Sequence, residues 1–270
     1  MRTNRRRLLQ GAAGAGLVLS LGAAHPTSIN AAEMDELRIA MAALPPQLDP
    51  QTTDWIVMLR VYPMIFDTLL ERDWSQNGKL VPGLATEWTQ VDDLTLDLVL
   101  REDVQFQDGT PLTANDVKYT FDRSLQDDAK LEVNGIFRLA DVQALDDYTV
   151  RFITKQPSGS LLTQLSQRNA SIVPAAYHQE VGYEGFQQAP MGSGPFKLVE
   201  FVPDSQLKLV RNENYHGGMP AAKSVTVTAI PEVSTRIAAL LNGEVDLIVD
   251  VPPGQTPLIE DTAGFTLNSI

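Results

Sequence analysis

The sequence predicts an α/β fold, because segments with the periodicity of a strand alternate with segments with the periodicity of a helix. Every second residue from Leu94 to Leu100 is leucine, which is the pattern of a half-buried strand. Residues 224–230, 234–242 and 244–249 have the pattern of a strand, a helix and a second strand. Such a βαβ unit predicts that its two strands lie parallel.

Two antiparallel hairpins are expected beside these elements. The first joins residues 141–145 to 148–154 through Asp146-Asp147. The second joins residues 196–201 to 206–211 through a turn that has Pro203 at its second position.

The two helices have recognisable ends. Thr113 to Asp116 forms a capping box, in which the hydroxyl and the carboxylate can satisfy the first free N–H groups. Val117, Phe121 and Leu125 follow at a spacing of four, so we expect one apolar stripe. Gly243 stands where the second helix ends, a position that favours the left-handed conformation.

Composition excludes several classes of protein. The 270 residues contain 34 Asp+Glu against 21 Lys+Arg, a net charge of −13, and no cysteine. Without cysteine there is no disulfide scaffold, thiol nucleophile, thiolate zinc site or iron–sulfur cluster. The acidic balance argues against a protein that binds the phosphate backbone, so no nucleic-acid partner is expected.

Residues 1–32 predict an export signal rather than a part of the fold. Four arginines and no acidic residue are followed at 11–24 by an uncharged stretch that is too short to span a bilayer as a helix. Arg5-Arg6-Arg7-Leu8-Leu9 resembles a twin-arginine signal. A disordered basic tail is the alternative. With no cysteine for a lipid anchor, we expect an exported periplasmic protein.

No constellation of catalytic or metal-binding residues is recognisable. Beyond the signal the only histidines are His178 and His216, and neither belongs to a His-x-x-x-His pattern. Ser193 lies between two glycines that are too close together for a nucleophile elbow, and this segment leads into a strand. We therefore expect no enzymatic activity, no cofactor and no metal.

Six segments, taken in order, resemble one known family. They are Leu48-Asp49-Pro50; Leu80-Val81-Pro82-Gly83-Leu84-Ala85; Arg101 to Val117 with Asp108-Gly109; Gly192-Ser193-Gly194-Pro195-Phe196; Arg211-Asn212-Glu213-Asn214-Tyr215 with Gly217-Gly218; and Arg236 with Gly243-Glu244-Val245-Asp246. Together they resemble the extracytoplasmic solute-binding protein family 5 of ABC importers, the peptide- and nickel-binding group. The chain departs from that pattern at Ser193, where threonine is usual, and at His216, where tryptophan is usual.

The resemblance implies a periplasmic-binding-protein-like fold (type II, cluster C) whose two lobes close on a ligand. Lobe I would comprise residues 33–66 and 183–270, with a β-rich subdomain, 67–182, inserted in it. Family members continue for about as many residues again, so the resemblance implies that the second lobe is missing and that the chain is a fragment. One wall of a clamp gives a shallow, wet site, so we expect weak binding or none.

The implied function is that of a monomeric substrate-binding component that binds peptides in the periplasm and delivers them to a membrane permease. A receptor for a nickel chelate, an opine or an oligosaccharide is the alternative within the family. A truncated product that binds nothing and an exported hydrolase are the alternatives of another class.

Positional matching to the family implies five ligand-binding residues. Thr53, Asp54 and Trp55 follow the first motif, in a loop that would face the ligand. The alternative for Trp55 is a core position, because it begins an apolar segment. Arg168, with Asn169 beside it, stands where nickel-chelate binders place an arginine for a carboxylate. The alternative for Arg168 is an exposed surface charge.

Overall fold

The computed structural model describes residues 34–52, 58–125 and 137–267. The strands are β1 (Met34–Met41), β2 (Leu70–Asp73), β3 (Lys79–Pro82), β4 (Ala85–Gln90), β5 (Thr95–Leu100), β6 (Leu139–Ala144), β7 (Thr149–Thr154), β8 (Phe196–Val202), β9 (Gln206–Arg211), β10 (Ala222–Ala229) and β11 (Leu247–Ile248). The helices are α1 (Met58–Ile65), α2 (Ala114–Leu125), α3 (Leu161–Gln164), α4 (Ala175–Gln188), α5 (Val233–Leu241) and α6 (Thr256–Glu260), with short 3₁₀ helices η1 (Trp74–Gln76), η2 (Arg168–Ala170) and η3 (Pro253–Gln255). The predicted export signal and Thr53, Asp54 and Trp55 lie outside the described residues.

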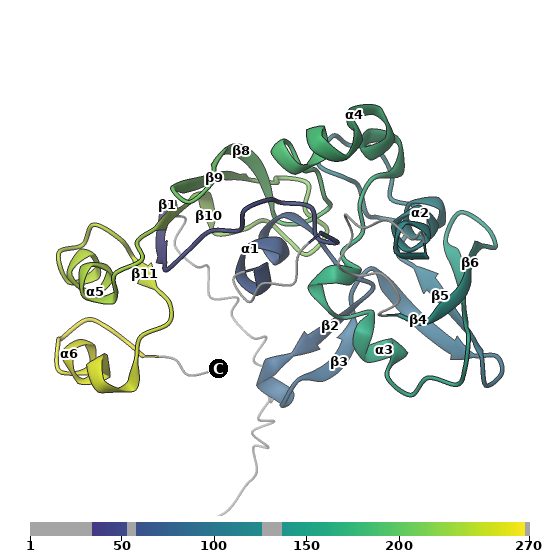
Figure 1. Cartoon of the computed structure of the whole chain (residues 1–270), viewed down its shortest axis with the longest axis horizontal. Helices are drawn as coiled ribbons and strands as arrows, with labels where there is room; N and C mark the ends of the chain where they lie inside the picture. The colour runs from purple at the N-terminus through teal and green to yellow at the C-terminus, as the bar shows by residue number, and fades with distance from the viewer. Residues whose placement is uncertain (1–33, 53–57, 126–136, 268–270) are drawn as a thin grey trace, which may run out of the picture. The chain divides into compact units, whose positions relative to one another are not determined.

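A five-stranded mixed sheet has the strand order β11-β1-β10-β9-β8 (Figure 1). The predicted βαβ unit is confirmed, since β10 and β11 are joined through α5 and both run parallel to β1. The sequence did not indicate that β1 lies between them. β11 is also shorter than the predicted strand 244–249, because the N–H groups of Glu244 and Val245 still bond to Ala239 in α5.

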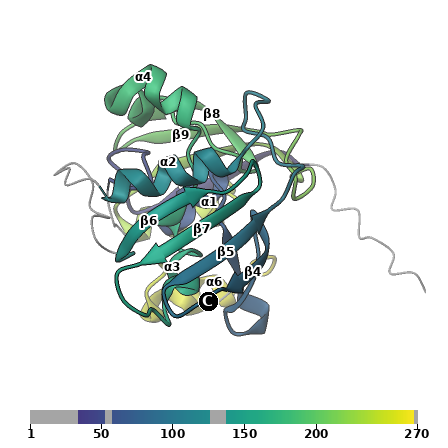
Figure 2. The same cartoon turned by 90° about the vertical axis from the view of Figure 1, so that its right-hand side faces the viewer.

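A four-stranded antiparallel sheet has the order β4-β5-β7-β6 and is covered by α2 (Figure 2). The strand predicted from the leucine repeat is confirmed, with Leu96, Leu98 and Leu100 buried. Both predicted hairpins are also confirmed, as β6–β7 and β8–β9.

The start of α2 differs in detail from the predicted capping box. The Asp116 carboxylate accepts the N–H of Thr113 at 2.9 Å, as expected. The Thr113 hydroxyl donates to the same carboxylate at 3.0 Å instead of accepting a backbone N–H. Val117 and Phe121 are buried, but Leu125 is 38% exposed, so the apolar stripe ends one turn early.

The buried side chains form three cores. One joins the four-stranded sheet, α2 and neighbouring segments between Leu69 and Ile172. The second packs α1 against the five-stranded sheet, and the third packs α5 and α6 near Ala40. The inserted subdomain and its boundaries at 66/67 and 182/183 stay a prediction.

The backbone of residues 192–194 passes directly against the end of α1. A Cβ atom on Gly194 would lie 2.5 Å from the carbonyl carbon of Ile65 and 2.7 Å from the N atom of Phe66. The N–H of Gly194 donates to the Ile65 carbonyl at 2.9 Å. Only glycine fits this approach, which explains the glycines that bracket Ser193.

Gly194→Ala is therefore expected to lower the free energy of unfolding by about 1–3 kcal/mol, because α1 and the strand entrance must move apart. Urea unfolding followed by circular dichroism measures this loss. Gly159→Ala is the matched control, since a Cβ there meets nothing within 4 Å. Equal stability of the two variants would contradict the close approach.

Candidate functional site

The carboxyl ends of three parallel strands lie at one edge of the five-stranded sheet. β1 ends at Met41, β10 at Ala229 and β11 at Ile248. In open α/β sheets, ligands bind outside the carboxyl ends of the parallel strands. The candidate ligand-binding segments are therefore those that leave these ends, residues 42–52, 230–232 and 249–253, together with α1.

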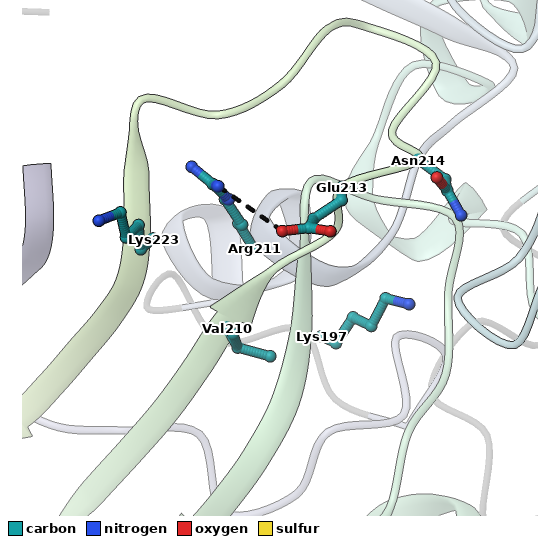
Figure 3. Close-up of a pocket in the computed structure, with 6 residues that line it drawn as sticks. All are labelled: Lys197, Val210, Arg211, Glu213, Asn214 and Lys223. Atoms are coloured by element: carbon teal, nitrogen blue, oxygen red, sulfur yellow. Dashed lines mark ion pairs between the residues drawn. The ribbon is translucent and has the colours of Figure 1, made fainter. Parts of the chain in front are cut away.

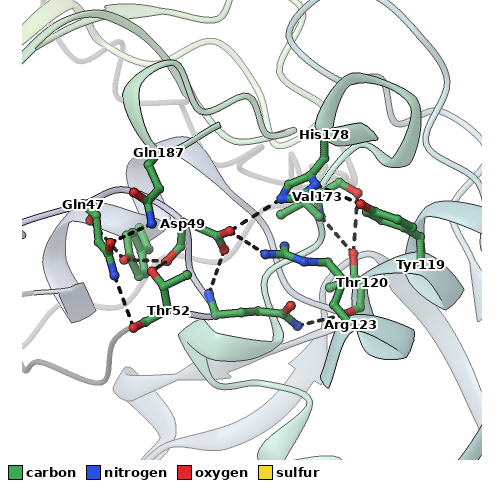
Figure 4. Close-up of polar contacts among 11 residues, drawn as sticks. Gln47, Asp49, Thr52, Tyr119, Thr120, Arg123, Val173, His178 and Gln187 are labelled. Atoms are coloured by element: carbon green, nitrogen blue, oxygen red, sulfur yellow. Dashed lines mark hydrogen bonds and ion pairs between the residues drawn. The ribbon is translucent and has the colours of Figure 1, made fainter. Parts of the chain in front are cut away.

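The side chain of Asp49 is completely buried in the segment that leaves β1 (Figure 4). Its Oδ2 accepts a hydrogen bond from Arg123 of α2, and its Oδ1 accepts the N–H of Gln51 at 3.0 Å. His178 of α4 places Nε2 3.6 Å from the same Oδ2. The Nδ1 atom of His178 shares a 2.8 Å hydrogen bond with the Tyr119 hydroxyl. This network ties the segment to two helices that come much later in the chain.

Two opposing effects set the charge of Asp49. Burial alone would raise the pKa of its carboxyl group. The neighbouring His178 imidazole and the Arg123 guanidinium outweigh burial, so the pKa of Asp49 lies below its ordinary value. Arg123 is itself 6% exposed, so the two form a buried ion pair.

Further hydrogen bonds fix the backbone around Asp49. The side-chain amide of Gln51 donates to the Thr120 carbonyl at 2.8 Å. The hydroxyls of Thr52 and Tyr62 both donate to the Asp49 carbonyl, at 2.9 and 3.0 Å. Helices α1 and α2 therefore hold this segment from two sides.

Arg168 and Asn169, two of the predicted ligand-binding residues, lie in η2, which packs against α1. Arg168 is half-buried, and burial lowers the pKa of its guanidinium group. Asn169 is 5% exposed, and its Oδ1 atom has no hydrogen-bond partner among the described residues. Arg168 is thus not a fully exposed charge, although its role stays a prediction, as do those of Thr53, Asp54 and Trp55.

Sequence reasoning missed the Asp49–Arg123 pair. In the sequence, Asp49 was recognised only as part of a scaffold motif. It stands between Leu48 and Pro50 in an apolar segment, and a carboxylate that is buried there needs a cationic partner. Arg123 follows Asp116 and Thr120 on one face of α2, at helical spacing. These three polar residues on one helix face indicate a buried polar contact, but they do not identify Asp49 as the partner of Arg123.

A second buried carboxylate, Asp67, joins two of the sequence motifs. It accepts hydrogen bonds from Ser193 at 2.7 Å and from Tyr215 at 3.1 Å. The Nε2 atom of His216 lies 3.2 Å from it, and burial together with the charges of Asp67 and Glu71 raises the pKa of Tyr215. A hydrolase triad places the histidine between the serine and the acid. Here the acid is in the middle, which favours a structural role.

A pocket of about 420 Å³ opens at the opposite edge of the sheet, where β10 begins (Figure 3). It is lined by Lys197, Val210, Arg211, Glu213, Asn214 and Lys223. Its cations are already engaged: Lys197 donates to the Gln107 carbonyl, Arg211 lies 3.6 Å from Glu213, and Lys223 pairs with Asp35. The lysine side chains point away from each other, so they do not converge on one ligand.

Two kinds of feature are absent from the described part of the chain. No cluster of three or more histidine, aspartate or glutamate side chains there is placed to hold a metal ion. None of the helices described is long and apolar enough to cross a membrane.

Asp49→Asn is expected to lower the free energy of unfolding by about 3–5 kcal/mol at pH 7, because it leaves Arg123 buried without its partner. Since the folded-state pKa of Asp49 is lowered, the stabilisation is present above the unfolded pKa of about 3.9 and is lost as the pH falls through the folded value. The loss caused by the substitution should therefore shrink towards a pH of about 2.5. Urea unfolding at the two pH values measures it.

Asp97→Asn is the matched control for this prediction, because it breaks the partly exposed pair with Arg151. Such pairs contribute about 0–1 kcal/mol. A loss at pH 7 that is no larger for Asp49→Asn than for Asp97→Asn would contradict the central role of the buried pair.

Comparison with known proteins identifies relatives of this chain. Escherichia coli K12 has a probable D,D-dipeptide-binding periplasmic protein, DdpA, that is 33% identical over 249 residues, covering 88% of this chain and 48% of that protein. The nickel-binding periplasmic protein of the same organism is 31% identical, covering 68% of this chain and 36% of that protein. The chain thus spans about half the length, or less, of the curated relatives it matches.

Solved structures agree with this result. The nickel ABC transporter protein of Bacillus halodurans has a TM-score of 0.75 and 28% identity, covering 85% of this chain and 46% of that one. The binding protein DppA of Helicobacter pylori, in complex with the peptide STSA, has a TM-score of 0.76 and 26% identity, covering 86% and 50%. The predicted α/β periplasmic-binding-protein-like fold is confirmed, and only about half of each structure is matched.

The family match covers most of the chain. Residues 79–269 match the family described as bacterial extracellular solute-binding proteins, family 5 Middle. This span contains five of the six motifs in part or whole, and the first, with Asp49, precedes it. The chain belongs to family 5 of the bacterial extracellular solute-binding proteins.

Proposed function

We propose that this chain is the first half of the substrate-binding component of an ABC importer, and that its solute is a peptide. The observation that carries the proposal is the 33% identity to DdpA, a probable D,D-dipeptide-binding periplasmic protein, across 88% of the chain. The glutathione-binding protein GsiB of Escherichia coli, 30% identical over 86% of the chain, supports a peptide-like solute. DppA of Helicobacter pylori is an ABC transporter-associated binding protein, which supports delivery to a membrane permease.

The candidate site supports binding of a solute that carries a carboxylate. Arg168 offers a guanidinium fork, which suits two carboxylate oxygens, and the buried Asn169 beside it adds a polar side chain. Both lie in η2, which packs against α1. Thr53, Asp54 and Trp55 complete the proposed set from the sequence.

We further propose that the protein acts in the periplasm as a monomer, with residues 1–32 as its export signal. DdpA and the nickel-binding relative are periplasmic proteins, which supports this location. Lobe I would consist of residues 33–66 and 183–270, and the separate core around the four-stranded sheet supports an inserted subdomain at 67–182.

A nickel chelate is the second candidate solute. The nickel-binding relative and the Bacillus halodurans structure support it, and Arg168 would suit the carboxylates of an organic chelator. A panel of dipeptides and of nickel–histidine complexes distinguishes the two, because a peptide receptor would bind the dipeptides without nickel.

If the chain supplies only one wall of a clamp, residues 33–270 should bind a dipeptide no more tightly than a Kd of about 1 mM, equivalent to about 4 kcal/mol. A clamp gains most of its affinity by enclosing the ligand, and one wall leaves it in water. Calorimetry with Ala-Ala measures this affinity. Micromolar binding would show that the chain needs no second lobe.

In a complete receptor that joins this chain to the second half of DdpA, Arg168→Ala should weaken Ala-Ala at least tenfold, or about 1.4 kcal/mol, because a charged hydrogen bond is lost. The affinity for the amide form of the dipeptide, which lacks the carboxylate, should fall much less on the same substitution. Arg151→Ala is the control, since it removes an arginine from β7 in the other sheet. If the Arg168→Ala variant and the parent bind Ala-Ala with equal affinity, Arg168 does not bind the carboxylate of the solute.

A further inference from the structure

Helix α4 is interrupted by a kink at Gly182. This residue has a φ of 67° and a ψ of 177°, which are not helical torsion angles. Such a combination is adopted almost only by glycine. A Cβ atom at Gly182 would have no packing contact within 4 Å. The conformation of the backbone, and not the packing around it, therefore requires glycine at this position.

The kink folds the second half of α4 back on the first half. The Tyr177 hydroxyl donates to the Ala189 carbonyl at 2.8 Å. In a straight helix, residues 177 and 189 would lie about 18 Å apart along the axis, beyond the reach of a tyrosine side chain. The ring centre of Phe186, which is completely buried, lies 4.7 Å from that of His178. These contacts hold the two halves of α4 together.

The two halves of α4 reach the same segment of chain, residues 47–52 (Figure 4). Before the kink, His178 places Nε2 3.6 Å from Oδ2 of Asp49. After the kink, the side-chain amide of Gln187 donates to the side-chain oxygen of Gln47 at 2.7 Å. In a straight helix, residues 178 and 187 would lie about 14 Å apart along the axis and on opposite faces. Residues 47 and 49 are at most about 7 Å apart, so only the kinked helix can contact both.

The contact of Gln187 is passed on to the end of this segment. Gln47 donates from its side-chain amide to the Thr52 carbonyl at 3.3 Å. Thr52 directly precedes Thr53, Asp54 and Trp55, which were proposed from the sequence to bind the solute. Binding groups must be held within about 0.5 Å of the productive geometry, and contacts behind them provide this precision.

We propose that Gly182 and Gln187 are positioning residues for solute binding. The kink lets both halves of α4 hold residues 47–52, and this hold fixes the start of the segment that binds the solute. Gly182 acts through Gln187, and Gln187 acts through Gln47. The inference rests on the proposed function, because it assigns these contacts to the binding of a peptide.

The first experiment needs no solute and follows the side-chain amide signals of residues 33–270 by ¹⁵N–¹H NMR. Gly182→Ala and Gln187→Ala should both shift the signal of Gln47, which is assigned by its loss in Gln47→Ala. An unchanged Gln47 signal in either variant would overturn the inference. Gln187→Ala leaves the backbone of α4 as it is, so it keeps the test decisive if Gly182→Ala does not fold.

Two matched controls accompany these variants. Gly109 also has a positive φ, 91°, and a Cβ atom there would also meet nothing within 4 Å. Gly109→Ala therefore introduces a comparable strain at a turn that does not contact residues 47–52. Gln188→Ala removes the same kind of side chain from the neighbouring, exposed position of α4. Neither control should shift the Gln47 signal.

The second experiment measures affinity for Ala-Ala in the receptor completed with the second half of DdpA. Gly182→Ala should weaken binding about tenfold and Gln187→Ala about threefold, because the supporting hydrogen bond is lost. The double variant should bind no more weakly than Gly182→Ala alone, since the two residues act through one contact. Gly109→Ala and Gln188→Ala should bind as the parent does. If Gly182→Ala and Gly109→Ala lower the urea midpoint alike and both bind Ala-Ala as the parent does, Gly182 has only a structural role and the inference fails.

The two experiments separate failure of the inference from failure of the proposed function. If the parent receptor binds Ala-Ala and the variants at 182 and 187 bind it equally well, the inference is wrong and peptide binding stands. If the parent receptor does not bind Ala-Ala, the proposed peptide function is wrong. In that case the Gln47 signal still decides whether the kink holds residues 47–52.

Discussion

The buried ion pair of Asp49 and Arg123 connects the segment that leaves β1 to helix α2, across 74 positions of the chain. Neither charge could be buried alone without a large desolvation cost, so the two segments must fold against each other. Once they do, Gln51, Thr52 and Tyr62 have their hydrogen-bond partners within reach. The position of the segment that leaves β1, at the carboxyl edge of the large sheet, depends on this contact.

Asp67 has a comparable role at the other end of α1. Its carboxylate forms hydrogen bonds with the hydroxyls of Ser193 and Tyr215 and with the imidazole of His216, and thereby joins segments that are far apart in the sequence. Close to it, the glycines on either side of Ser193 let the backbone pass against Ile65. Helix α1 is therefore anchored by one buried carboxylate before it and another after it. The proposed ligand contact of Arg168 depends on this anchored helix, since η2 packs against it.

Local patterns in the sequence predicted most of the elements. The leucine alternation, the Pro203 turn and Gly243 each determine the conformation of residues that are adjacent in the sequence. They could not predict that β1 separates β10 from β11, since strand order depends on distant packing. The same limit applies to the site. Arg123 has no local pattern that identifies Asp49 as its partner, because the two residues are 74 positions apart in the sequence. Family resemblance supplied Arg168 and Asn169, which periodicity alone would not have singled out.

The short length of β11 has a consequence for self-association. β11 pairs with β1 only at Ile39 and Ala40, so the preceding part of β1 would present an open edge to other chains. On that edge the Asp246 side chain accepts a hydrogen bond from the N–H of Arg38, and the N–H of Asp246 donates one to the Arg38 carbonyl. Asp35 and Glu36 add negative charge farther along. Asp246 thus occupies the backbone groups of Arg38 to which a strand of another chain could bond. This contact opposes the growth of the sheet by addition of further chains.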